Sequence, residues 1–312
     1  METRAKNMTK REYRIFKRMR RCWQLYLLLL LPAVYLFIFH YVPMYGATLA
    51  FKEYNPVGGI MGSPWVGLEY FERFVTSPSF FSVVKNTLLL SVYTLVFSMP
   101  FPILLALSLN ECRSKFARKT VQMVTYAPYF ISTVIMVALL MQWSSVNGGL
   151  FNNIIGLFGF EPVNLFSDAK YFRSTYVISN IWQFTGFNSI IYLAALAGVD
   201  MGLYEAAKVD GATKLQKIWY IDLPSLLPTI VILLILNVGQ IMNVGFEKVY
   251  LMQNDLNVQV SEIIATYTYK IGLLELNFSY STAVGLFNSI INFILLITVN
   301  TIARRMGDTS LW

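Results

Sequence analysis

Long apolar stretches separated by short polar segments dominate this chain of 312 residues. A helix needs about 20 mostly apolar residues to cross the hydrocarbon core of a bilayer. Six stretches qualify: Leu25 to Val42, Asn86 to Leu109, Val121 to Gln142, Tyr176 to Ala197, Ser225 to Val244, and Ala283 to Ala303. Because lipid offers no hydrogen-bond partners to the backbone, each stretch is expected to be helical. The pattern therefore predicts an all-α, polytopic bundle of six transmembrane helices.

The composition agrees with a membrane protein. Hydrophobic residues make up 56% of the chain and charged residues only 13%, whereas a soluble domain has about 25% charged residues. We expect one membrane domain over residues 25–303, between a basic segment (1–24) and a short tail (304–312). A basic start before an apolar run also resembles a signal peptide, but the run is long and no convincing small-residue cleavage site follows it. Retention as a spanning helix is the expectation.

Basic residues gather in alternate loops. The N-terminal segment holds 9 Lys and Arg, the loop near Arg113 holds 4, the loop at 204–224 holds 3 and the tail holds 2, which makes 18. The remaining loops hold seven: Lys52, Arg73, Lys85, Lys170, Arg173, Lys248 and Lys270. Since loops rich in Lys and Arg stay in the cytoplasm, both termini and the 204–224 loop are expected there. The net charge of +8 is thus attributed to topology, and nucleic acid binding is not expected.

Several spans carry features that a simple anchor does not need. Four prolines are expected to bend their helices: Pro32, Pro100, Pro102 and Pro128. Amide side chains recur in spans four to six: Asn180, Gln183 and Asn188; then Asn237, Gln240 and Asn243; then Asn288 and Asn292. The spacing i, i+3, i+6 in span five predicts one polar stripe on a helix. Such residues either join helices by hydrogen bonds or line a path for a hydroxylated solute, and the sequence leaves both open.

Features absent from the sequence limit the ways in which this chain could drive transport. No Asp, Glu, Lys or Arg lies in the middle of a predicted span, although coupled carriers usually bury charge there. The chain has no phosphate-binding loop of the GxxxxGKS or GxxxxGKT form, and it has no catalytic constellation or metal-binding cluster. It is therefore expected to be no enzyme, and active transport would need a partner that hydrolyses ATP.

The loop YEAAKVDGATKLQKIWYIDLP, residues 204–224, is polar and favours helix. A first helix is predicted from Leu203 to Val209, with Glu205 in its first turn, where the helix dipole favours an anion. Gly211 suits the left-handed conformation that ends a helix. A second run, Leu215 to Ile221, is expected to stop at Pro224, which would then begin span five. This hairpin (201–224) either enters a cleft of another protein or rests on lipid.

A resemblance narrows that choice. The hairpin matches, without a gap, the EAA-G-I-LP signature of permease subunits of binding-protein-dependent ABC importers, at Glu205, Ala206, Ala207, Gly211, Ile221, Leu223 and Pro224. Similarity covers nearly the whole chain. PMYGATLAFKEYNP, GSPWVGLEYF, TYTYKIGL and FSYSTAVGLFNSIINF resemble the carbohydrate-uptake branch, particularly LplB-type permeases for oligo- and polysaccharides. The resemblance implies a type I importer (MetI-like) architecture.

The resemblance also implies partners. It places the chain in a bacterial plasma membrane beside a second homologous permease, with an external solute-binding lipoprotein and a cytoplasmic ATPase dimer. The hairpin would enter a groove of the ATPase, where Glu205 pairs with a basic residue and Gly211 permits the turn. ATP and Mg would be bound by that partner, and this chain would hold no cofactor and no metal.

For a carbohydrate, the expected path residues are Gln183, Asn237, Gln240 and Asn243, with Trp182, Tyr126 and Phe184 as aromatic surfaces for sugar rings. The alternatives are a stand-alone secondary carrier, which predicts buried ionisable residues and more spans, and a scaffold that moves nothing.

Overall fold

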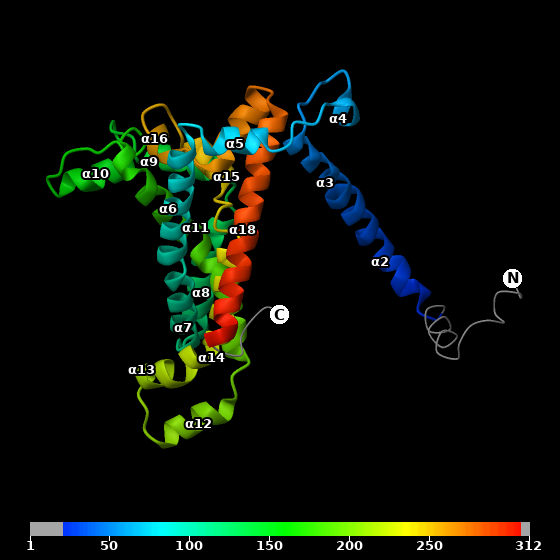
Figure 1. Ribbon diagram of the computed structural model, residues 1–312. Helices are drawn as coiled ribbons and strands as arrows, with labels where there is room; N and C mark the ends of the chain where they lie inside the picture. The colour runs from blue at the N-terminus through cyan, green and yellow to red at the C-terminus, as the bar shows by residue number, and fades with distance from the viewer. Residues whose placement is uncertain (1–20, 307–312) are drawn as a thin grey trace, which may run out of the picture.

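The computed structural model describes residues 21–306, which form a bundle of long helices with shorter helices gathered at one end (Figure 1). Two ends are defined here. The hairpin end carries α12 (Met201–Val209) and α13 (Lys214–Lys217), and the opposite loop end carries α5 (Glu69–Val75) and α15 (Phe246–Met252). Residues 21–306 contain no β-strand and one isolated bridge, between Lys52 and Trp65. The predicted all-α class is confirmed.

Up to six segments in the described range can cross a membrane. Four are continuous helical segments: Trp23–Phe51, Phe80–Asn110, Lys214–Val238 and Phe278–Arg305. Two are bent pairs: Lys115–Phe130 with Thr133–Trp143, at 101°, and Ala169–Ala197 with Met201–Val209, at 74°. These segments correspond to the six predicted spans.

The elements of the first segment are α2 (Trp23–Leu36), the π-helical η2 (Phe37–Tyr41), α3 (Val42–Met44) and the 3-10 segment η3 (Tyr45–Phe51). The bundle contains α6 (Phe80–Ser98), α7 (Pro100–Asn110), α8 (Lys115–Tyr126), the 3-10 segment η4 (Ala127–Phe130), α9 (Thr133–Trp143), α11 (Ala169–Ala197), the π-helical η5 (Ile218–Asp222), α14 (Leu223–Val238) and α18 (Phe278–Met306). The loop end adds α4 (Gly59–Gly62), α10 (Leu150–Leu157), α16 (Val258–Ser261), α17 (Ile264–Tyr269) and the π-helical η6 (Lys270–Leu274).

The prolines act in different ways. Pro128 lies in η4, and the chain turns sharply just beyond it, as expected. Pro32 lies inside α2 without ending it. Pro224 lies in the first turn of α14, as expected. The second hairpin run does not stop there, however, because one helical segment continues from Lys214 to Val238. The π-helical turn η5 directly before Pro224 supplies the physical reason: its wider turn makes room for a ring that has no N–H to donate.

One glycine sets how closely two helices approach. A Cβ atom on Gly186 of α11 would lie 2.0 Å from the carbonyl oxygen of Thr125 in α8. Real side chains cannot occupy that space, so the two backbones touch only because residue 186 is glycine. This contact seats α11 against the helix before the sharp bend.

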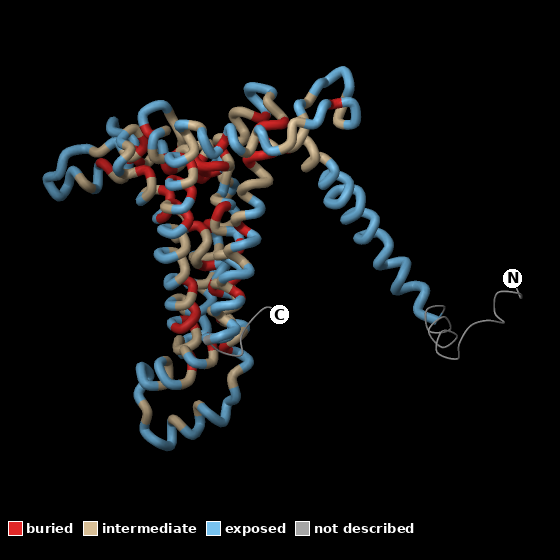
Figure 2. The backbone as a smooth tube through the Cα atoms, viewed as in Figure 1, coloured by how far each residue is buried: buried red, intermediate tan, exposed pale blue. Residues whose placement is uncertain are grey.

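Buried side chains concentrate at the loop end and along the inner faces of the bundle (Figure 2). The largest buried apolar cluster joins α6, α9, α11 and α15 through residues such as Leu90, Met136, Phe172 and Val249. By contrast, α2, η2 and α3 project away from the bundle, and the most apolar window of their segment has no buried residue (Figure 2). The 3-10 end of the segment, η3, packs against α18 and α5. Residues 23–44 therefore lack a packing surface within the described chain.

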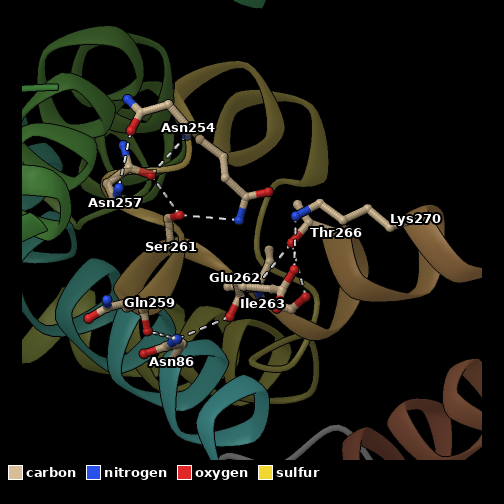
Figure 3. A network of polar contacts seen from close by, with 10 residues as sticks. Asn86, Asn254, Asn257, Gln259, Ser261, Glu262, Ile263, Thr266 and Lys270 are labelled. Carbon is tan, nitrogen blue, oxygen red and sulfur yellow. Dashed lines mark hydrogen bonds and ion pairs between the residues drawn. The ribbon is translucent and has the colours of Figure 1, made fainter. Parts of the chain in front are cut away.

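A network of polar contacts fixes the chain around α16 at the loop end (Figure 3). Asn86 of α6 donates from Nδ2 to the carbonyl oxygens of Gln259 (2.9 Å) and Glu262 (3.2 Å). Lys270 forms an ion pair with Glu262 at 2.9 Å. Helix α16 ends at Ser261 and α17 begins at Ile264, so the helical path is interrupted at residues 262–263. The contacts with Asn86 explain the interruption, since they use a carbonyl that a continuous helix would need.

Candidate functional site

A polar cavity of about 470 Å³ opens among α6, α11, α14 and α15. Its polar lining comes from Ser91, Thr94, Thr133, Tyr176, Asn180, Gln183, Asn237, Gln240, Asn243, Glu247 and Lys248. The four predicted path residues Gln183, Asn237, Gln240 and Asn243 are thus brought together. A second cavity of about 270 Å³ shares Asn180, Phe184 and Asn237 with the first and continues along α11 past Asn188. The two cavities make a polar path towards the hairpin end.

Gln183, which is 3% exposed, lines the first of these cavities. Its Nε2 donates to the carbonyl oxygen of Ile131 at 3.2 Å. That carbonyl lies at the break between η4 and α9, where no helical N–H is available to it. Gln183 therefore joins α11 to the broken span by a hydrogen bond, and it also lines the cavity.

The path also contains a charge that the sequence did not reveal. Lys248 of α15 is 5% exposed, and its Nζ donates to Asn180 Oδ1 at 3.0 Å and to Gln183 Oε1 at 3.4 Å. Burial lowers the pKa of the Lys248 ammonium to about 8, so the side chain stays mainly charged at neutral pH. No predicted span holds a central charge, but the neighbouring segment supplies one. The only signal was a lysine inside the short apolar run FEKVYLM.

Span five ends earlier than expected. Helix α14 stops at Val238, not Val244, so Gln240 and Asn243 lie beyond the helix and the predicted helical stripe is wrong. Asn292 of α18 explains the early end, because its Oδ1 accepts the backbone N–H of Met242 at 3.0 Å in place of a helical carbonyl.

The unwound residues still face the same space. Asn243 donates to Gln240 Oε1 at 2.7 Å and accepts from Asn288 Nδ2 at 2.8 Å. The amide chain thus reaches from the end of span five to α18.

Of the three aromatic residues expected along the path, one lines the cavities and two do not. Phe184 lines both cavities. Among the described residues, Trp182 and Tyr126 do not line either one. Trp182 is 43% exposed and meets Trp143 edge-on with ring centroids 6.2 Å apart. Tyr126 ends α8, beside the crossing at Gly186.

The hairpin has the expected turn. Gly211 adopts φ +72°, the left-handed conformation predicted for it. Helix α12 is capped by Asp200, whose Oδ1 accepts the N–H of Gly202 at 2.9 Å. The helix therefore begins at Met201, and Glu205 lies in its second turn, not the first turn that was expected.

The inner face of the hairpin is tied to its own bundle. The Tyr204 hydroxyl donates to Oδ1 of the buried Asp222. Lys217 forms an ion pair with Glu111, at the end of α7, with Nζ and Oε1 2.6 Å apart. Ile221 and Leu223 are half-buried at the base of the hairpin, beside the exposed Pro224.

The outer face of the hairpin is unoccupied by the described chain. Glu205 and Ala206 are exposed, and Ala207 is half-buried. Within residues 21–306, the Glu205 carboxylate makes no hydrogen bond or ion pair. An acidic, small-residue surface is thus presented at the tip of the molecule.

Residues 98–308 match the family described as "Binding-protein-dependent transport system inner membrane component". The chain belongs to this family. It is a non-catalytic, multi-pass permease subunit of an ABC importer, and the expected type I permease architecture is confirmed.

Individual relatives match this chain over nearly its whole length. It is 46% identical to the polygalacturonan/rhamnogalacturonan transport system permease protein YteP of Bacillus subtilis (strain 168), over 92% of this chain and 90% of that protein. It is 43% identical to Protein LplB of the same organism, over 92% and 91%. A chain of a bacterial ABC transporter that imports the acidic polysaccharide alginate is 39% identical, with a TM-score of 0.86, over 94% of this chain and 99% of that one.

Proposed function

We propose that this permease forms, with a second homologous permease, the translocation path of a carbohydrate importer in a bacterial plasma membrane. The observation that carries the proposal is the amide-lined cavity inside an otherwise apolar bundle. Amide side chains offer both donors and acceptors, which suit the hydroxyl groups of a sugar. Phe184 offers an apolar face to the same space. The oligo- and polysaccharides named for YteP, for the alginate importer and for arabinooligosaccharide permeases support this substrate class.

The exposed first helix is evidence in favour of a second permease. The segment Trp23–Phe51 carries apolar residues on all sides, yet it leaves its own bundle without contact along most of its length. In a paired assembly this helix lies against the other permease, and lipid covers the remainder. The partner also closes the cavity in the same arrangement.

The hairpin is the proposed joint with the ATPase. It lies in the cytoplasm with both termini, and its exposed Glu205 pairs with a basic residue in a groove of the ATPase dimer. ATP and Mg are bound by that dimer, and their binding and hydrolysis move the hairpin and switch the bundle between outward and inward access. The ties from Lys217 to Glu111 and from Tyr204 to Asp222 make the hairpin move with its bundle.

The loop end is the proposed seat of an extracellular solute-binding lipoprotein. Its loops are held in place by the contacts of Asn86 and by the pair Lys270 and Glu262. A second solved relative, 38% identical with a TM-score of 0.87, is the alginate transporter in complex with an alginate pentasaccharide-bound periplasmic protein.

Reconstitution tests the proposal. The permease, its partner permease and their ATPase are placed in vesicles with the binding protein and a radiolabelled oligosaccharide. Uptake is expected only with ATP and to disappear when the phosphate-binding lysine of the ATPase is replaced. Uptake by the permease without any ATPase would instead favour a secondary carrier, and ATPase binding without uptake would favour a scaffold.

A further inference from the structure

We propose that Lys248 binds substrate carboxylates in the translocation cavity and makes this permease selective for acidic oligosaccharides, those that contain uronate sugars. This inference deepens the proposed function and rests on it, since it assigns the substrate class to the cavity already described.

The first support is the position of the Lys248 ammonium. Lys248 is almost completely buried, yet it borders the cavity, within reach of Asn180 and Gln183 of α11. An ammonium has three N–H donors, and these two amide oxygens accept two of them. The Tyr176 ring lies on another side, with its centroid 5.5 Å from Nζ. One donor is left for a group in the cavity.

The second support is the missing counter-ion. The two ion pairs among residues 21–306 join Lys217 to Glu111 and Lys270 to Glu262, and neither includes Lys248. Glu247 borders the same cavity, but it is exposed and is not within ion-pair distance of Lys248. A buried charge without an opposite charge is unfavourable and marks a functional site in membrane proteins.

The third support is the chemistry around the ammonium. If Lys248 served only to hold the amides of Asn180 and Gln183, a neutral donor would do so without burying a charge. A carboxylate entering the cavity would balance this charge and accept a hydrogen bond from the free N–H of Lys248. Asn237 and Gln240 line the same cavity and can bond to the hydroxyls of the same sugar. A neutral sugar would leave the charge unbalanced, so the site discriminates by charge.

The experiment compares two sugars of equal length in vesicles that hold the whole importer. Uptake of trigalacturonate and of the neutral galactotriose is measured at saturating binding protein. Loss of a charge-assisted contact predicts that Lys248→Met lowers trigalacturonate uptake about tenfold and changes galactotriose uptake less than about twofold. Lys248→Arg keeps the charge and is expected to retain most trigalacturonate uptake. Lys170→Gln, which removes an exposed positive charge outside the cavity, is the matched control and should change neither.

The outcomes separate the two proposals. An equal loss for both sugars in Lys248→Met, or unchanged trigalacturonate uptake, overturns the carboxylate site and leaves carbohydrate import standing. Uptake of galactotriose but not of trigalacturonate by the wild-type importer would also overturn the carboxylate site and leave carbohydrate import standing. ATP-dependent uptake of neither sugar, nor of any other oligosaccharide, overturns the proposed function itself. If Lys248→Met does not assemble, Lys248→Gln, which keeps a donor for Asn180, provides the same comparison.

Discussion

The cavity and the hairpin both carry polar side chains, but the two regions differ in whether these side chains find hydrogen-bond partners within the chain. In the cavity, Gln183 and Asn243 bond to other groups of the same chain, and even Lys248 holds two amide oxygens. On the hairpin, Tyr204 and Lys217 of the inner face bond to other parts of the chain in this way. The Glu205 carboxylate is exposed and makes no polar contact within residues 21–306.

This difference shows how stability and function are distributed. A cavity residue that also bonds to the backbone supports the fold, so its loss affects both properties. A hairpin residue that faces outward contributes nothing to the isolated chain, so its loss is felt only in the assembly. Mutations can therefore separate the two regions.

Glu205→Lys is expected to have the largest effect. If Glu205 pairs with a basic residue in the ATPase groove, removing one partner of such a buried pair costs about 2–5 kcal/mol, which corresponds to roughly thirtyfold or more in ATPase affinity. Because Glu205 is exposed, the free energy of unfolding should change by less than about 0.5 kcal/mol. Co-purification of the ATPase and ATP-driven uptake measure the effect. Asp210→Asn, an exposed neighbour outside the signature, is the control, and normal assembly of Glu205→Lys would refute the joint.

Gly211→Val should weaken the joint through the backbone alone. A Cβ at this position meets no atom of another residue within 4 Å beyond its two chain neighbours, so a clash with the rest of the protein is not involved. A β-branched residue at φ +72° is disfavoured by about 1–2 kcal/mol, which predicts about tenfold weaker coupled uptake. Gly211→Asn adds similar bulk but tolerates this conformation and should retain most activity. Equal losses in the two variants would mean that the turn conformation is not the cause.

Two cavity variants test whether cavity residues carry a double role. Gln183→Leu leaves the Ile131 carbonyl without its partner and should destabilise the protein by about 1–3 kcal/mol as well as lower uptake. Asn237→Leu should lower uptake alone, because within the described chain the Asn237 side chain makes no hydrogen bond. Thermal unfolding in detergent and uptake in vesicles are compared, and ATPase binding should survive in both. An equal loss of stability in the two variants would contradict the distinction.

The ion pair between Lys217 and Glu111 should have the smallest effect. Its side chains are 23% and 15% exposed, so solvent screens the pair in part, and a coupling energy of about 0.5–1 kcal/mol is expected. A double-mutant cycle with Lys217→Met and Glu111→Gln, read by thermal unfolding, measures it. Strictly additive losses would show that the pair does not tie the hairpin to α7.

Local patterns were enough to foresee much of the molecule. The apolar stretches predicted the spans because a helix across lipid satisfies its own backbone, and no distant contact is needed to specify it. The left-handed turn at Gly211 was foreseen for a similar reason, since its φ depends on the residue type. The hairpin signature also predicted the family.

Two helix boundaries are set where a distant residue competes for a backbone group. Val238 ends its helix because Asn292 takes the N–H of Met242, 50 residues before it. Helices α16 and α17 are interrupted at residues 262–263 because Asn86 takes the carbonyl of Glu262. Neither competitor lies near the affected helix in the sequence.

By itself, the sequence determined which segments cross the membrane, where the hairpin turns and which family the chain belongs to, because these depend on composition and on residues close together. Only the tertiary structure decided that Lys248 lies in the polar path while Trp182 does not. The physical reason is that burial and charge balance depend on how separate helices pack. A lysine counted among the loops became, among residues 21–306, the one cation lining the cavity when Lys248 of α15 met Asn180 of α11.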